Sequence, residues 1–185
     1  FVTCVTWGIS MAQSKSEIRN QVRENRRFNP VNSNFDYLLE VPEVKQSEVI
    51  ASFYPIEFEP NPISLNEELI KLNKVLLLPR INDGNLEFIK YDGNNLIKNG
   101  IFHEPEGMPF FGEINTVLVP ALSVDRAGIR LGQGGGFYDK FLATTSAFRI
   151  ALINENEFVK ALPHEWHDQK MDAVALATGL VRIPQ

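Results

Sequence analysis

The chain is poor in cysteine, in net positive charge and in long apolar runs, and each shortage excludes a class of protein. Among its 185 residues Cys4 is the only cysteine, so no disulfide can form within the chain, which favours a reducing compartment. The formal net charge is −5, whereas general nucleic-acid binders present a strongly basic face. No apolar run reaches the roughly 20 residues that span a bilayer. We therefore expect a cytoplasmic protein that binds neither nucleic acid nor membrane.

The first residues carry no recognisable targeting signal. FVTCVTWGIS is apolar but has neither a basic region nor a long hydrophobic region, and Met11 is a credible natural start. We expect residues 1–13 to form a disordered leader. A chain of this length with 44% hydrophobic residues can bury one good core, so we expect a single domain over residues 14–185.

Short apolar runs alternate with helical patterns along the rest of the chain. Ser14 and Glu17 fit a capping box that opens a helix ending near Phe28. Further helices are predicted at 35–39, 63–71 and 137–142. Strands are predicted at 49–54, 75–78 (stopped by Pro79), 86–91, 116–119, 149–153, 173–177 and 180–183, with 159–162 ambiguous and 97–111 extended or irregular. Several of the strands are uniformly apolar, which predicts an α/β protein of three layers, with a largely parallel sheet and helices on both faces.

The most informative stretch is DRAGIRLGQGGGFYDKFL, residues 125–142. Glycines at this density allow positive φ and bring backbone N–H groups close to an anion. The stretch matches neither a P-loop nor a dinucleotide-binding fingerprint, because no glycine precedes Lys-Ser or Lys-Thr and Phe137 stands where a third glycine is needed. A tight turn is the commoner use of such a cluster. The charges of Arg126, Arg130 and Lys140, with Asp139 as a potential metal ligand, favour a ligand site.

The predicted first helix is locally basic on an acidic chain. Arg19, Arg23 and Arg26 share one of its sides at i, i+4 and i+7, while its apolar stripe consists of only Ile18 and Val22. The arginines alone fit a solvated basic face as well as a site for a small anionic ligand.

Several separated motifs together resemble the 5-formyltetrahydrofolate cyclo-ligase family. They are K-x-x-x-R at Lys15 and Arg19, a strand leading to Glu59, LLLPR at 76–80, the pair Glu104-Pro105, VPALSVDRAGIRLGQGGGFYDKFL from Val119, and HEWHDQKMD at 164–172. They occur in the family's order from about residue 15 to the end. The segment from Arg130 to Asp139 is highly specific, whereas K-x-x-x-R alone would mean almost nothing.

The resemblance implies a fold and an activity. The fold would be of the NagB/RpiA/CoA-transferase-like type. The enzyme would use ATP and Mg²⁺ to cyclise 5-formyltetrahydrofolate, with or without a polyglutamate tail, to 5,10-methenyltetrahydrofolate, and would release ADP and phosphate. The formyl oxygen would be phosphorylated and then displaced by N10. We expect a monomer whose partners are small molecules.

The resemblance also implies the site residues. The ATP-binding residues would be Lys15, Arg19, Arg130, Leu131, Gly132, Gln133, Gly134, Gly135, Gly136, Phe137 and Tyr138. The folate-binding residues would be Tyr54, Glu59, Gly135 and Tyr138, with Glu59 accepting from pterin N–H groups. Asp139 and Asp168 would hold Mg²⁺, and Arg130 and Asp139 would be catalytic.

The chain departs from the family pattern at three places, and two other functions stay open. Pro60 and Pro62 follow Glu59 and would shift it, Gln133 replaces a residue that is often tyrosine or arginine, and Phe137 replaces a common tyrosine. A sugar-phosphate isomerase or acyl-transferase relative would need an acid/base or nucleophile pair, and none stands beside the glycines. A non-catalytic folate- or nucleotide-binding paralogue would have lost Arg130 or a metal aspartate, yet all are present.

Overall fold

The computed structural model describes residues 13–184. The predicted leader therefore lies outside the described residues except for Gln13, and so do Cys4 and Met11. Within the described range, no helix combines the length and the apolar character needed to cross a membrane.

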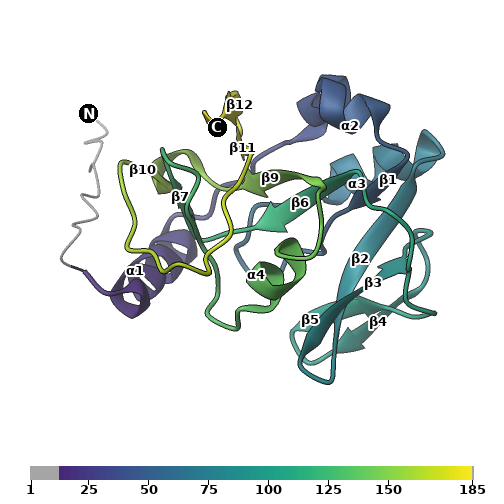
Figure 1. Ribbon diagram of the computed structural model, residues 1–185, viewed down its shortest axis with the longest axis horizontal. Helices are drawn as coiled ribbons and strands as arrows, with labels where there is room; N and C mark the ends of the chain where they lie inside the picture. The colour runs from purple at the N-terminus through teal and green to yellow at the C-terminus, as the bar shows by residue number, and fades with distance from the viewer. Residues whose placement is uncertain (1–12, 185) are drawn as a thin grey trace.

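A seven-stranded sheet forms the centre of the molecule (Figure 1). Its strands are β1 (Val49–Ala51), β2 (Val75–Asn82), β3 (Asn85–Lys90), β6 (Thr116–Pro120), β9 (Phe148–Leu152), β11 (Ala173–Leu176) and β12 (Gly179–Arg182). The order across the sheet is β12-β11-β9-β6-β1-β2-β3, and only the two edge strands run antiparallel to their neighbours. The predicted largely parallel α/β sheet is confirmed.

Helices cover both faces of this sheet, as expected. One face carries η1 (Asp36–Glu40), α2 (Pro42–Gln46) and α3 (Ile63–Lys71), and the other carries α4 (Phe137–Leu142). Successive residues of a strand point to opposite faces, so Leu76 packs in the core with Leu69 of α3, whereas Leu77 packs in the core with Leu142 of α4. Burial on both sides explains why the inner strands are apolar without alternation.

The path of the chain creates a switch point between β1 and β6, which are neighbours in the sheet. After β1 the chain passes through α3 to β2 on one side, and after β6 it passes through α4 to β9 on the other. The loops at the carboxyl ends of β1 and β6 therefore diverge. In open α/β sheets this divergence leaves a crevice where ligands bind.

A second, three-stranded sheet lies beside helix α1 at one end of the molecule (Figure 1). It consists of β7 (Ser123–Asp125), β8 (Arg130–Leu131) and β10 (Phe158–Val159), the last preceded by η2 (Glu155–Glu157). Helix α1 (Lys15–Phe28) begins with the predicted capping box, in which the Glu17 amide donates to Ser14 Oγ (3.3 Å) and the Ser14 amide donates to Glu17 Oε2 (2.7 Å). Its stripe of Ile18 and Val22 packs on Leu131 and its neighbours in this sheet.

A buried ion pair fixes α1 to the second sheet. The guanidinium of Arg26 donates to Glu157 through Nε (2.7 Å) and Nη2 (2.8 Å), and Nη2 also donates to the carbonyl of Ala121 (2.6 Å). The exposed fractions of the two side chains are only 4% and 2%. A solvated role for this arginine is therefore wrong, and its charge is committed to holding the helix.

Residues 97–111 contain regular structure that the sequence prediction missed. Strands β4 (Leu96–Asn99) and β5 (Phe102–Pro105) pair as an antiparallel hairpin at the end of the molecule away from α1 (Figure 1). Its turn contains Gly100 at φ 63°. Because Asn99 pairs with Phe102, the two-residue loop is Gly100-Ile101, and glycine at its first position is a hairpin signal that the abundance of Pro and Gly in this region obscured.

Proline does not stop β2, contrary to expectation. The carbonyl of Leu77 faces β1, where it accepts from the Ser52 amide (2.8 Å), and residue 79 faces the same side because it is two residues on. Strand β1 ends at Ala51, so the missing N–H of Pro79 removes no ladder hydrogen bond and the strand continues to Asn82.

Helix α3 and the strands at the carboxyl end of the chain lie within one or two residues of their predicted bounds.

We predict that Arg26→Met strongly destabilises the protein, because it leaves the Glu157 carboxylate buried without a counter-charge. Losing one partner of a buried pair costs about 3–5 kcal/mol. The matched control is Arg27→Met, next to it on the same helix but exposed, which we expect to change the free energy of unfolding by less than about 0.5 kcal/mol. Urea denaturation of both variants measures the difference. Equal stability of the two would mean that the ion pair does not anchor α1.

Candidate active site

A cavity of about 760 Å³ opens at the carboxyl ends of β1, β2 and β6, at the switch point. Its lining comes from α1, the loop after β1, the end of β2, the β4–β5 hairpin and the loop after β6. Residues 132–136, here called the glycine-rich loop, and residues 165–168 also line it. All fifteen site residues proposed from the sequence line it: Lys15, Arg19, Tyr54, Glu59, Arg130, Leu131, Gly132, Gln133, Gly134, Gly135, Gly136, Phe137, Tyr138, Asp139 and Asp168. The fold brings these distant segments around one space.

The glycine-rich loop presents its backbone to the cavity. Gly134 has φ 109° and Gly136, which precedes α4, has φ 68°; both are values that side chains rarely tolerate. In the described part of the chain, none of the amides of residues 132–136 donates to a protein acceptor. A run of unpaired backbone N–H groups beside a cavity is suited to an anion.

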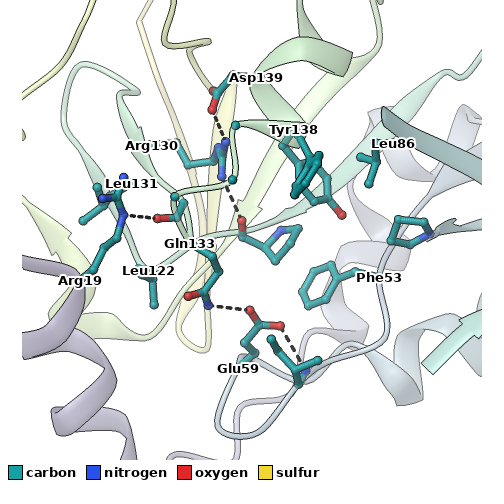
Figure 2. A pocket seen from close by; sticks show the side chains of 18 of the residues that line it. Arg19, Phe53, Glu59, Leu86, Leu122, Arg130, Leu131, Gln133, Tyr138 and Asp139 are labelled. Atoms are coloured by element: carbon teal, nitrogen blue, oxygen red, sulfur yellow. Dashed lines mark hydrogen bonds and ion pairs between the residues drawn. The ribbon is translucent and has the colours of Figure 1, made fainter. Parts of the chain in front are cut away.

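Helix α1 places its basic side against this loop (Figure 2). Arg19 Nε donates to the carbonyl of Gly132 (2.9 Å), and Arg23 Nη2 donates to the carbonyl of Gln133 (3.1 Å). Lys15, one turn before Arg19, also lines the cavity. Two cations of this side of the helix therefore hold consecutive residues of the glycine-rich loop, although Arg23 itself is exposed.

Two of the charges expected to serve this loop lie elsewhere. Arg126 and Lys140 are exposed and do not line the cavity, so the expectation that they supply charge to the site is wrong. Arg126 follows β7, in the turn between β7 and β8, and Lys140 lies on the solvent side of α4. Only Arg130 of the three reaches the cavity, because it lies within β8, which leads directly into the loop.

Each of the two predicted metal aspartates is paired with a cation. Asp139 Oδ2 accepts from Arg130 Nη2 (3.0 Å), and Asp168 Oδ2 accepts from Lys15 Nζ (2.7 Å). The amide of Gln169 donates to Asp139 Oδ1 (3.3 Å), so the segment that carries Asp168 runs directly past Asp139. Burial opposes ionisation of Asp168, but its hydrogen bonds from Lys15 and the Glu165 amide outweigh burial and lower its pKa.

The side chains available in the cavity suit a metal ion that binds together with a ligand rather than one coordinated entirely by the protein. Within residues 13–184, no group of three or more His, Cys, Asp and Glu side chains could hold a metal. Two carboxylates remain, and Mg²⁺ commonly takes one or two carboxylates and completes its shell with water and phosphate oxygens. Asp139 and Asp168 therefore fit Mg²⁺ bound together with a phosphate compound.

The other end of the cavity holds a carboxylate beside aromatic side chains (Figure 2). Glu59 Oε2 accepts from the Ile56 amide (3.2 Å), and Oε1 accepts from Gln133 Nε2 (3.1 Å). Burial raises the pKa of Glu59, although these two hydrogen bonds oppose the shift. The ring of Tyr54 packs on His103 of the β4–β5 hairpin with centroids 4.7 Å apart.

Tyr138 belongs to the core as well as to the cavity. Its ring packs against the core on the α4 side and lies 5.7 Å from the Arg130 guanidinium. Burial raises the pKa of its hydroxyl, which has no hydrogen-bond partner in the described structure. A buried hydroxyl without a partner at the wall of a cavity is available to a ligand.

Some lining residues were missed by sequence reasoning. Arg23 was seen only as part of a basic face, and the hairpin residues Ile101, Phe102 and His103 lie in a segment predicted to be irregular. Asp125 Oδ1 accepts from the amides of Ala127 and Ile129 and so fixes the turn before β8. Despite Pro60 and Pro62, helix α3 begins at Ile63 and Glu59 faces the cavity.

Comparison with known proteins points to one family. The model of the 5-formyltetrahydrofolate cyclo-ligase family matches residues 11–177. The 5-formyltetrahydrofolate cyclo-ligase of Mycolicibacterium smegmatis is 33% identical over 88% of this chain and 93% of its own length. The Escherichia coli enzyme of the same name is 28% identical over 74% of this chain and 82% of its own length.

Solved structures agree with these relatives. The 5,10-methenyltetrahydrofolate synthetase of Aquifex aeolicus is 25% identical, superposes with a TM-score of 0.76, and is matched over 92% of this chain and 93% of that protein. The synthetase of Mycoplasma pneumoniae, at 20% identity and a TM-score of 0.57, shows a shared fold. The family model covers most of the sequence, one relative exceeds 30% identity, and the chain therefore belongs to the 5-formyltetrahydrofolate cyclo-ligase family.

Proposed function

We propose that this enzyme converts 5-formyltetrahydrofolate to 5,10-methenyltetrahydrofolate with MgATP and releases ADP and phosphate. One observation carries the proposal. The unpaired amides of residues 132–136 and the cations of α1 line the same cavity as Glu59, so an anion site and an acidic recognition group lie within reach of one another. The names of the family and of its curated members support the cyclo-ligase reaction.

The chemistry explains the need for two adjacent sites. A formamide carbonyl is a poor electrophile, and its oxygen is a poor leaving group. Transfer of the γ-phosphoryl group of ATP to that oxygen, with release of ADP, gives an imidate-like phosphate. N10 of the same folate then attacks the formyl carbon and loses its proton. The bond between the formyl carbon and oxygen breaks, and the oxygen leaves as part of phosphate. Phosphoryl transfer of this kind needs mainly positioning and charge neutralisation.

In this proposal the glycine-rich loop and its cations bind the triphosphate. The backbone N–H groups of residues 132–136 donate to phosphate oxygens, and Lys15 and Arg19 clamp them from α1. Arg130, buried beside the loop, stabilises the charge that develops during transfer; its Nε has no partner in the described structure and is free to donate. A guanidinium withdrawn from water acts more strongly on a phosphoryl group than an exposed one.

Asp139 and Asp168 would hold the magnesium ion. The ion would neutralise phosphate charge and help to align the transferred group. Because each aspartate is neutralised by Arg130 or Lys15, an incoming phosphate would draw the cation toward itself and leave the carboxylate for the metal. The exchange preserves the overall charge balance of the site.

Glu59 would recognise the pterin by accepting hydrogen bonds from its N–H donors, a paired and charge-assisted contact. Tyr54 would contribute an aromatic face, and Gly135 and Tyr138 would contact the folate where it approaches the phosphate. The exposed apolar side chains of Phe58, Ile81, Ile101 and Phe102 at this end of the cavity give flat aromatic parts of a ligand a surface to cover.

The purified protein should turn over 5-formyltetrahydrofolate when ATP and Mg²⁺ are supplied, because the residues proposed to bind phosphate, metal and folate line one cavity. Growth of the methenyl absorbance band measures the reaction. Binding of both ligands without growth of the band would instead indicate a non-catalytic paralogue. Failure to bind either ligand would contradict the assignment altogether.

We predict that Asp139→Asn lowers kcat on the order of 10²–10³-fold while folate binding survives, because the substitution removes a negative ligand of the metal but not a folate contact. Steady-state kinetics and calorimetric titration with 5-formyltetrahydrofolate separate the two effects. Asp92→Asn, in an exposed turn outside the cavity, is the control and should turn over normally. Equal loss of folate binding in Asp139→Asn would show that this carboxylate has been given the wrong role.

Magnesium alone should bind poorly, since both aspartates are engaged by cations and the described residues offer no larger cluster of ligands. Calorimetric titration with MgCl₂ should give no saturable heat for the free enzyme and saturable heat once ADP is present. Equally tight binding with and without ADP would argue for a preformed metal cage and against this arrangement.

A further inference from the structure

The side chain of Gln133 bridges α1 and the loop after β1. Figure 2 shows the part of this bridge that reaches Glu59. Its Oε1 accepts from Arg23 Nε (3.1 Å) and Nη2 (2.8 Å), and its Nε2 donates to Glu59 Oε1 (3.1 Å). Arg23 also donates to the backbone carbonyl of Gln133. The bridge joins three segments that are distant in sequence, so only the folded chain can form it.

The two neighbours of Gln133 determine which way its amide faces. A guanidinium only donates hydrogen bonds, and an ionised carboxylate only accepts them. The amide oxygen must therefore face Arg23, and the amide nitrogen must face Glu59. The reversed amide would set donors against the guanidinium and an oxygen against the carboxylate. A glutamate at this position would satisfy Arg23 and repel Glu59, so the bridge requires an amide.

The bridge acts on a carboxylate that has few other partners. Glu59 accepts from the Ile56 amide in its own loop and from Gln133. Glu57 of its own loop also acts on it, and the charged and titratable groups on neighbouring elements are Arg26 of α1 and Tyr138 of α4. Burial favours the neutral acid, and the Gln133 hydrogen bond favours the ionised form that a pterin N–H would need.

We propose that Gln133, held in one orientation by Arg23, is a positioning residue for Glu59 and fixes the folate-recognising carboxylate from the glycine-rich loop. The inference rests on the proposed function, in which Glu59 binds the pterin. It assigns a role in folate binding to a side chain whose backbone belongs to the phosphate site, and it adds Arg23 to the groups on which folate affinity depends.

Gln133→Glu is the sharpest test, because it keeps the size of the side chain and its bond to Arg23 but replaces the donor to Glu59 with a negative charge. We expect the KM for 5-formyltetrahydrofolate to rise about tenfold, the size of effect typical of a hydrogen bond to a charged group. Gln133→Ala and Arg23→Gln should act in the same direction and more weakly. Arg27→Gln, an exposed arginine of α1 outside the cavity, is the control.

The pH profile separates positioning from simple loop packing. Loss of the Gln133 donor removes a hydrogen bond that favours the carboxylate, so the pKa of Glu59 should rise in Gln133→Ala and further in Gln133→Glu. The acid limb of kcat/KM for folate should then move to higher pH in both variants and stay in place in Arg27→Gln.

Two outcomes would overturn the inference, and they are distinguishable. If Glu59→Gln weakens folate binding but Gln133→Glu leaves both KM and the acid limb unchanged, Gln133 does not position Glu59 and the proposed function stands. If the wild-type enzyme does not bind 5-formyltetrahydrofolate at all, the proposed function fails and the inference falls with it.

Discussion

The buried pair of Arg26 and Glu157 decides where α1 lies, and the geometry of the cavity depends on that position. The apolar stripe of α1 is too thin to set the rotation and the height of the helix by itself, because only Ile18 and Val22 are deeply buried apolar residues. A guanidinium that makes two bonds to one carboxylate tolerates little displacement when both groups are withdrawn from water. With the end of the helix held in this way, Arg19 and Arg23 meet the carbonyls of Gly132 and Gln133.

The cavity is preorganised by pairing opposite charges before any ligand is present. Arg130 neutralises Asp139 and Lys15 neutralises Asp168, so each of these four groups has a counter-charge in a partly dehydrated site. A magnesium–nucleotide complex presents the same two signs of charge, anionic phosphates and a divalent cation. In the proposed function it would exchange partners with these pairs rather than create new charge in the site. The electrostatic cost of assembling the reactive complex is thereby limited.

The glycine-rich loop contributes to both ends of the cavity, with its backbone at one end and a side chain at the other. Its unpaired backbone amides belong to residues that line the space in which we propose the phosphates bind, and the side chain of Gln133 reaches the carboxylate of Glu59, which we propose recognises the pterin. This division follows from composition. Four glycines leave the backbone accessible, and the single residue with a side chain among them, Gln133, lies between Arg23 and Glu59. The switch point between β1 and β6 provides the crevice in which the two functions meet.

Local sequence determined much of this protein. The capping box at Ser14, the bounds of α3 and α4, the apolar parallel strands and the motif from Arg130 to Asp139 were all predictable, because caps, periodicity and glycine density act over a few residues. The candidate residues at the site could also be named from their resemblance to a family. Only the tertiary structure decided that β2 continues past Pro79, that Arg126 and Lys140 lie away from the cavity, and which partner each charged side chain takes. Arg26, Arg23 and Gln133 have no local signal for their contacts, because hydrogen bonds and ion pairs between segments some 70 to 130 positions apart depend on how the sheets and α1 pack.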